Sequence, residues 1–201
     1  MLKRTLALLS LSLLLTACGF HLRGTGAIQF ALQEINVTAR DAYGDLAQAV
    51  RKRLEANKVT VSSAAPYTLH ISREQRSQRT ASYTAGTRSA EITLTTQADF
   101  EILGRNNLLL LTEQVEVERT YSYDSNNLGG SNQEASMLRA EMQRELVEQV
   151  AMRLQMITPE RLDQLQREAE RKAAAAAEAE ARAKQVRDEL TAPQQSPIQI
   201  P

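Results

Sequence analysis

The sequence predicts an α+β fold in which two helices pack on one face of a four-stranded mixed sheet, with an extended C-terminal helix or tail. Four segments alternate apolar and polar residues, two segments repeat apolar residues at spacings of three and four, and an alanine- and charge-rich stretch ends the chain. Each predicted helix has one apolar stripe and the sheet has one apolar face. Both helices are therefore expected on the same face of the sheet, in two layers.

The first strand and the first helix are predicted over residues 34–56. Residues 34–40 alternate, which is typical of a half-buried strand. Its apolar side chains are Ile35, Val37 and Ala39. Asp41 precedes an apolar stripe at helical spacing. The stripe consists of Leu46, Ala49, Val50 and Leu54. Asn57 is expected to end this helix in the left-handed conformation.

Three further strands follow. The second starts at Tyr67 and continues into the polar stretch 73–80, and residues 81–88 are expected to join it to the third strand as a hairpin. The third strand buries Ala90, Ile92, Leu94, Ala98, Phe100 and Ile102. A turn at 104–107 leads to the fourth strand. This strand is expected to bury Leu109, Leu111, Val115, Val117, Tyr121 and Tyr123.

The opposite face of the sheet is predicted to be polar. Threonine, glutamine and acidic residues alternate with the buried positions of the third and fourth strands. The pattern alone favours an ordinary solvated face, and the alternative is a polar surface docked in a wet, confined site.

The second helix is expected after the polar loop 124–132. Ser131 and Glu134 have the spacing of a capping box, in which a hydroxyl and a carboxylate accept hydrogen bonds from amides of the first turn. The apolar stripe that follows consists of Leu138, Met142, Leu146, Val150, Leu154 and Ile157.

The chain divides into five parts by composition. Residues 1–17 form a signal peptide, 18–33 a lipidated lead, 34–157 the α+β domain, 158–190 a charged, alanine-rich helical tail and 191–201 a disordered end. Thr158, Pro159 and Glu160 predict the start of the tail helix. Its charges form acid-to-base pairs four residues apart, so the tail is expected to be a solvated spacer. No apolar heptad pattern persists along the tail, which disfavours a coiled coil.

The first residues have the layout of an export signal. Lys3 and Arg4 precede an apolar segment at 6–15 that is too short to span a membrane. The sequence Leu-Thr-Ala-Cys at 15–18 resembles the lipobox of bacterial lipoproteins, in which the cysteine is acylated after cleavage. Lipid chains on Cys18 would anchor the protein. By resemblance to the sorting pattern of enteric lipoproteins, Gly19 directs it to the outer membrane.

Composition excludes several other classes. The 24 basic and 24 acidic residues balance, which argues against a nucleic-acid binder. One cysteine excludes a disulfide framework, and two histidines leave little for a zinc site. His21 and His70 lie in no recognisable motif, and the chain has neither a nucleophile elbow nor a glycine-rich phosphate loop. No enzymatic activity, metal site or cofactor is expected beyond the covalent lipid.

The residues after the lipobox carry a family resemblance. Cys18 is followed by Gly19, Phe20, His21, Leu22 and Arg23. This opening, together with the order strand, helix, three strands, helix, resembles the LPS-assembly lipoprotein family, LptE. The resemblance implies a lipid-anchored, periplasm-facing protein that plugs the lumen of the outer-membrane β-barrel LptD, assists its assembly and helps deliver lipopolysaccharide to the outer leaflet. The alternative is a lipid-anchored periplasmic chaperone or assembly factor for a different envelope machine, and a lipoprotein hydrolase is more distant.

The resemblance also implies contact with lipopolysaccharide, whose phosphates arginine binds well. In this family, basic residues near the hairpin between the second and third strands and after the fourth strand are linked to this binding. Here the loop at 127–130 has no base, and the hairpin base is displaced to Arg88. Arg76, Arg79 and Arg88 are therefore replacement candidates, and the alternative is that they are ordinary solubilising charges.

Overall fold

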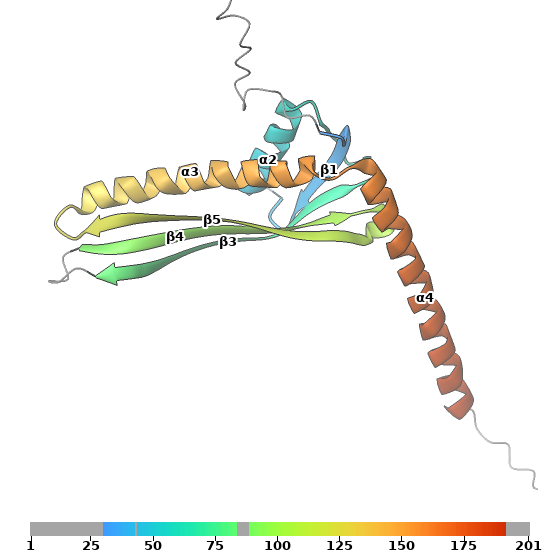
Figure 1. The fold of residues 1–201 in the computed structure, drawn as a ribbon. Coiled ribbons are helices and arrows are strands. Elements are labelled where there is room, and N and C mark those ends of the chain that lie inside the picture. Colours follow the sequence, from blue (N-terminus) through green and yellow to red (C-terminus); the bar gives the residue numbers. More distant parts are fainter. Residues whose placement is uncertain (1–29, 43, 84–88, 192–201) are drawn as a thin grey trace, which may run out of the picture.

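A computed structural model describes residues 30–42, 44–83 and 89–191, and Figure 1 shows its fold. The elements in chain order are β1 (Glu34–Ala39), α2 (Asp45–Ala56), β2 (Thr60–Val61), β3 (Thr68–Tyr83), β4 (Ser89–Leu103), a short 3-10 turn (Arg105–Asn107), β5 (Leu109–Asp124), α3 (Leu128–Gln155) and α4 (Pro159–Thr191).

The strands form one mixed sheet in the order β2-β1-β3-β4-β5. β1 runs parallel to both β2 and β3, and β3, β4 and β5 are antiparallel. The α+β class is confirmed, but the strand count is five rather than four. The additional strand is β2, where Thr60 and Val61 pair with Glu34 and Ile35. Two residues are too few to produce an alternation that the sequence could reveal.

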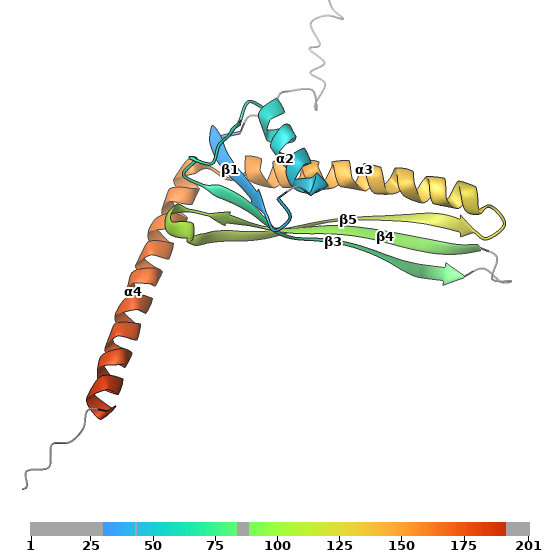
Figure 2. The ribbon, with the colours of Figure 1, turned by 180° about the vertical axis from the view of Figure 1, so that it is seen from behind.

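The sheet extends into a long three-stranded ribbon. Only the first four residues of β3 pair with β1, whereas β3 and β4 pair from Thr68–Leu103 to Tyr83–Ala90. β4 and β5 pair over a similar length. α3 lies along one face of this ribbon, with α2 beside it near β1 (Figures 1 and 2). The molecule is therefore an elongated two-layer body with one face of the ribbon free of helices.

The core lies between the helices and the ribbon. α3 contributes residues at helical spacing that are almost completely buried, namely Met142, Leu146, Val150 and Leu154. They meet the apolar face of β4, with Leu94, Ala98, Phe100 and Ile102. The predicted stripes of α3 and β4 are confirmed, because a helix and a strand that each bury one face carry the clearest periodic signal.

One predicted core position on β5 is wrong. Leu109 is 53% exposed, whereas its neighbour Leu110 is 8% exposed. The pairing of β4 with β5 shifts register between Ile102 and Leu103, and such a shift reverses which side of the strand faces inward.

The ends of α2 and α3 also differ from the sequence expectation. Lys58, with φ 65°, adopts the left-handed conformation expected for Asn57, and the Asn57 side chain instead donates to the Arg53 carbonyl at 2.7 Å. α3 begins at Leu128, with the Asn127 side chain accepting from the Gly130 amide at 3.1 Å. Ser131 is thus inside the first turn. Asn127 caps the helix one turn earlier than the predicted capping box because the loop is shorter than expected.

α4 begins where the sequence predicts, since the Thr158 hydroxyl accepts from the Arg161 amide at 3.3 Å. Its first three turns are not a solvated spacer, because Leu162 and Gln166 are completely buried against the end of the sheet. Residues 171–190 are exposed throughout and project away from the domain (Figure 1). Within the described ranges, no helix is both long and apolar enough to cross a membrane.

Candidate functional site

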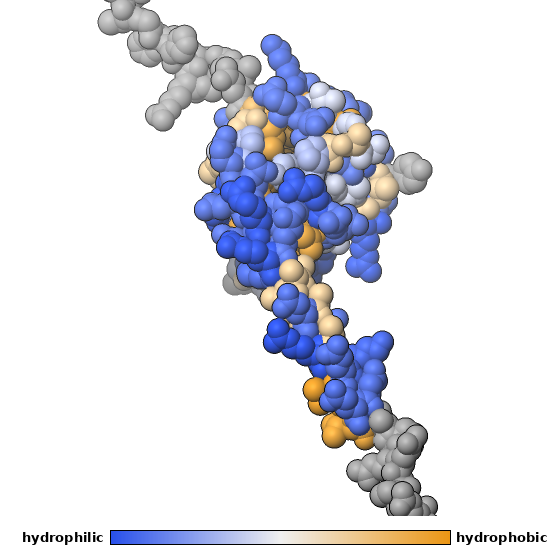
Figure 3. Space-filling model, turned by 90° about the vertical axis from the view of Figure 1, so that its right-hand side faces the viewer, coloured by the Kyte–Doolittle hydropathy of each residue, from blue (hydrophilic) through white to orange (hydrophobic). Residues whose placement is uncertain are grey.

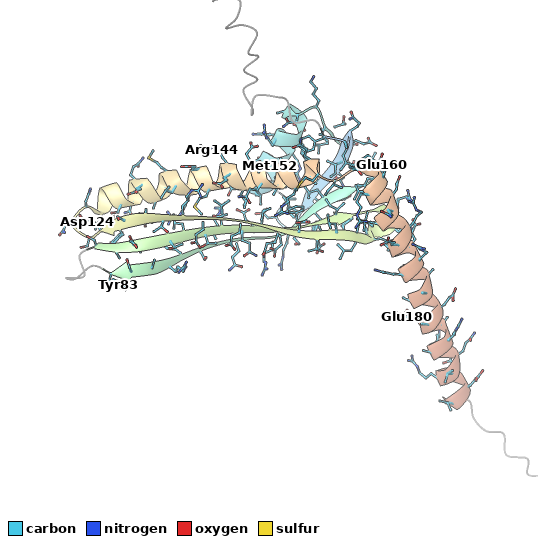
Figure 4. All side chains as sticks on the ribbon, in the orientation of Figure 1. Tyr83, Asp124, Arg144, Met152, Glu160 and Glu180 are labelled. Carbon is cyan, nitrogen blue, oxygen red and sulfur yellow. The ribbon has the colours of Figure 1, made fainter. Side chains whose placement is uncertain are left out.

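The face of the ribbon opposite α2 and α3 is polar except at its end near the β4–β5 turn, where Leu109 is exposed, and we call it the open face. Its side chains project from β3, β4 and β5 on the side away from α3 (Figure 4). They include Arg73, Arg79, Ser82, Glu91, Thr93, Thr95, Gln97, Asp99, Glu101, Gln114, Glu116, Glu118 and Thr120. The alternation of apolar and polar residues in β4 and β5 produces this face directly.

Asp99 is the centre of a hydrogen-bond network on the open face. Its carboxylate pairs with the Arg73 guanidinium at 2.6 Å and accepts from the amides of Gln97 at 2.9 Å and Gln114 at 3.0 Å. Burial opposes ionisation, but these hydrogen bonds and the charge of Arg73 outweigh it and hold the pKa of Asp99 below its usual value. The carboxylate is therefore a fixed anion that joins all three strands of the ribbon.

The remainder of the open face is linked in the same way. Arg79 lies 3.6 Å from the Glu118 carboxylate, which also accepts from the Thr95 hydroxyl at 3.5 Å. The hydroxyls of Thr93 and Thr120 are 3.4 Å apart. These cross-strand contacts order the polar side chains, and the resulting surface suits a wet, hydrogen-bonding partner better than an apolar one.

The structure separates two of the predicted lipopolysaccharide-binding residues. Arg76 and Arg79 are three residues apart in β3, so they face opposite sides of the strand. The register shift between Ile71 and Arg73 determines that Arg79 is the one on the open face and Arg76 the one on the helix side. The Arg76 guanidinium donates to Glu74 at 2.6 Å and to the Gln143 side chain of α3 at 3.1 Å. Both arginines are more than half exposed, but they face opposite sides of one strand and do not form a single clamp.

The other predicted site residues lie outside the described residues. These are Arg88, the lipidation residue Cys18 and the motif residues Gly19, Phe20, His21, Leu22 and Arg23. Their proposed roles therefore remain predictions from the sequence.

A cavity of about 650 Å³ opens between the end of β1, the start of α2 and the register shift in β3. Its charged lining residues are Arg40, Arg73, Arg76, Asp41, Asp45 and Glu74. Because the two signs balance, the cavity does not concentrate charge of one kind. In the part of the chain that the structure describes, no group of three or more histidine, cysteine or acidic side chains could hold a metal ion.

Sequence reasoning missed the joint that attaches α4 to the sheet. The Gln166 side chain accepts from the Arg105 amide at 3.1 Å and donates to Glu170 at 2.8 Å. The Tyr67 hydroxyl donates to Asp163 at 2.7 Å. Burial, followed by this hydrogen bond and the charge of Asp163, raises the pKa of Tyr67 to about 12. The only sequence signal for the joint was the apolar residues among the charges of the first turns of α4.

Comparisons with known proteins agree with this architecture. Residues 32–154 match the model of the LptE lipopolysaccharide-assembly family. The LPS-assembly lipoproteins LptE of Yersinia pestis and Yersinia pseudotuberculosis are each 35% identical over 154 residues, covering 73% of this chain and 73% of theirs.

Solved structures show the same fold at lower identity. The rare lipoprotein B of Shewanella oneidensis is 21% identical with a TM-score of 0.54, covering 60% of this chain and 92% of that one. A minor lipoprotein of Acinetobacter baumannii is 19% identical with a TM-score of 0.53, covering 63% of this chain and 93% of that one. The matched family region ends before α4 begins.

Proposed function

The chain belongs to the LptE lipopolysaccharide-assembly family, and from this premise we propose that it is an outer-membrane lipoprotein that plugs the LptD β-barrel. In this role it assists assembly of the barrel and the delivery of lipopolysaccharide to the outer leaflet. The family is one of assembly lipoproteins and not of enzymes.

The observation that carries the proposal is the open face on an elongated body. A 28-residue α3 has a length of about 42 Å at 1.5 Å per residue, close to the thickness of a whole bilayer of about 40–45 Å. The lumen of an outer-membrane barrel is polar. A rod of this length with ordered threonine, glutamine and charged side chains can fill such a lumen without burying apolar surface.

The lipid anchor is the second part of the proposal. Acyl chains on Cys18 would hold the plug at the membrane in which the barrel is inserted and raise its local concentration there. Replacing Cys18 with alanine should release the protein from the membrane fraction. Retention in that fraction at the original level would show that another segment anchors the chain.

Depletion of the protein in its own bacterium tests the function directly. We expect loss of surface lipopolysaccharide together with misassembled LptD, and LptD should co-purify with the tagged chain. Normal lipopolysaccharide export with correctly assembled LptD would reject the proposal. Depletion that instead disrupts a different envelope machine would favour the periplasmic assembly factor.

Photo-crosslinking tests the role of the open face. A photoreactive residue at Gln97 should capture the barrel, whereas the same residue at Ala181, on the projecting part of α4, should not. Equal capture from both positions would mean that the open face is not the specific barrel contact.

Lipopolysaccharide contact is proposed for Arg76, Arg79 and Arg88. Because Arg76 and Arg79 face opposite sides of β3, each would meet a separate phosphate or sugar group. Single alanine variants should weaken lipopolysaccharide binding while preserving folding, with Arg144→Ala on the outer side of α3 as the matched control (Figure 4). A variant that binds as tightly as the control would remove that arginine from the site.

A further inference from the structure

The outer half of α4 is a surface without an assigned role. Residues 171–190 are all exposed and project away from the sheet in both views (Figures 1 and 2). This segment also lies outside the region that matches the family.

The helix is held firmly where it leaves the domain. The Gln166 side chain fits over Gly104, where a Cβ atom would lie only 1.9 Å from the Gln166 Oε1 atom. Arg105 donates to Glu170 at 3.4 Å, one turn further along the helix. These contacts fix the direction of α4, so the outer half is presented as a straight helix.

An apolar seam on α4 is interrupted at Lys172 and resumes beyond it, past the contact with the domain. Residues spaced alternately three and four apart lie along one side of a helix. The inner members of the seam are Leu162, Leu165 and Ala169, which pack against the core. The outer members are Ala176, Ala179, Ala183, Val186 and Leu190. Val186 is 56% exposed and Leu190 is 82% exposed, and apolar surface gathers near the outer end of the helix (Figure 3).

Charges flank this seam in a self-complementary order. Glu180 and Arg187 lie on one flank, and Arg182 and Glu189 lie on the other, each pair seven residues apart. If two copies of the helix run antiparallel, like flanks face each other. Arg182 then meets Glu189 of the second copy, and Glu180 meets Arg187. A parallel pair would instead place Arg182 beside Arg187, which is repulsive.

We propose that the outer half of α4 is a self-association surface that pairs antiparallel with α4 of a second copy. The register that satisfies all four charges places Ala183 opposite Val186 and Ala179 opposite Leu190. Each large side chain thus faces a small one, which allows close helix packing. The two domains lie at opposite ends of the paired helices. The contact spans only residues 178–190 on each chain, so we expect a weak pair that forms when copies are concentrated on a membrane.

Disulfide trapping in the intact lipoprotein tests the pairing. Two differently tagged copies, one with Ala183→Cys and the other with Val186→Cys, are co-expressed and exported. We expect a mixed-tag dimer on a non-reducing gel, at least tenfold more abundant than from the matched pair Ala181→Cys with Lys184→Cys on the outer side of the helix. The chain has one native cysteine, so the parent protein is run alongside to show its own background.

Three outcomes of this experiment overturn the proposal. Equal trapping from the outer control pair would mean that the helices meet only by random collision. If one cysteine variant expressed alone forms as much dimer as the mixed pair, the helices are parallel. Absence of any dimer above the parent background would also reject the association.

A charge-swap series separates pairing from helix stability. Arg182→Glu should reduce the trapped dimer at least fivefold, and adding Glu189→Arg in the same chain should restore it. Lys184→Glu is the matched control, because it makes the same change in charge one step away from the interface. Each of these bases lies four residues after an acid, Glu178 or Glu180, so both variants disturb the helix alike. Equal loss of dimer in both variants, or no rescue by the second substitution, contradicts the proposed register.

Capture of LptD does not depend on this surface, so the proposed function and the proposed self-association can fail separately.

Discussion

At the scale of single residues, the joint between α4 and the sheet depends on the absence of one side chain. Gly104 has φ −98° and ψ −159°, a conformation that any residue can adopt. Glycine is required there for space, because Gln166 and Leu110 occupy the volume of a Cβ atom. A buried glutamine that bonds both to a turn and to its own helix then replaces water at the end of the sheet.

Gly104→Ala should therefore destabilise the protein by steric exclusion. The added methyl group would displace the Gln166 side chain and break its bond to the Arg105 amide, and we expect a loss of about 2–3 kcal/mol in the free energy of unfolding by urea titration. Gly129→Ala is the control. No atom lies within 4 Å of the position of its Cβ, so the change should be neutral or stabilise α3 slightly. Equal effects of the two variants would show that Gly104 is not a packing constraint.

Tyr67 supplies a pH-dependent contribution at the same joint. Its folded-state pKa of about 12 lies above the ordinary value of 10.0. The stabilisation is therefore complete below pH 10 and is lost as the pH rises through the interval from 10 to 12. Tyr67→Phe should remove that dependence and lower stability at neutral pH by about 1 kcal/mol through loss of the hydrogen bond to Asp163.

The measurement is thermal unfolding of both proteins from pH 8 to pH 12. The difference between wild type and Tyr67→Phe should shrink above pH 10. A constant difference across this range would mean that Tyr67 ionises normally in the folded protein.

At the scale of elements, α3 is the helix on which the ribbon depends. It contacts β4, β5 and α2, and its charged edge is joined to β5 by the pair Arg119–Glu145 and by Arg153–Glu113 at 3.6 Å. The ion pairs are partly exposed and contribute little to stability. The buried stripe provides most of the attachment, since three strands without a covered apolar face would not remain folded.

Leu146→Ala tests this attachment. The side chain is fully buried at the centre of α3, and its truncation should lower the free energy of unfolding by about 3–4 kcal/mol through lost burial and a cavity. Met137→Ala is the control on the same helix, because Met137 is 63% exposed and should change stability by less than about 0.5 kcal/mol. Similar losses in urea titration would mean that the helix face is assigned wrongly.

Elements with one buried face are also those that the sequence predicts well. β4 shows a period of 2 because every second side chain enters the core. α3 shows a period of 3.6 because its buried side chains are three or four residues apart. β2 is too short to show a period, and Leu110 turns inward only because the register of β4 against β5 shifts. Such features depend on pairing with a distant segment, which a local pattern does not contain.

The candidate site also has features that the sequence predicts and features that it does not. The open face was predicted from alternation, because polar residues on β4 must point away from the core. The odd spacing of Arg76 and Arg79 already implies opposite faces of a strand, but which of the two lies on the open face was not predictable, because it depends on the register shift between Ile71 and Arg73. The joint between α4 and the sheet was missed because the partners of Gln166 and Asp163, namely Gly104, Arg105 and Tyr67, are far from α4 in the sequence and carry no periodic signal.

At the scale of the whole molecule, α4 has an inner part that supports the fold and an outer part that does not, and truncated chains can distinguish the two roles. The inner part buries Leu162 and Gln166 and closes the end of the sheet, whereas residues 171–190 contribute no buried side chain. A chain that ends after Glu170 keeps the joint and should unfold with the free energy of the full protein, within about 0.5 kcal/mol. A chain that ends after Ile157 exposes Leu110 and Tyr67 and should lose about 3–5 kcal/mol. If both truncations destabilise equally in urea titration, the outer half of α4 supports the fold and is not free to serve as a contact surface. If only the shorter chain is destabilised, the outer half can pair with a second copy at no cost to the domain that carries the open face.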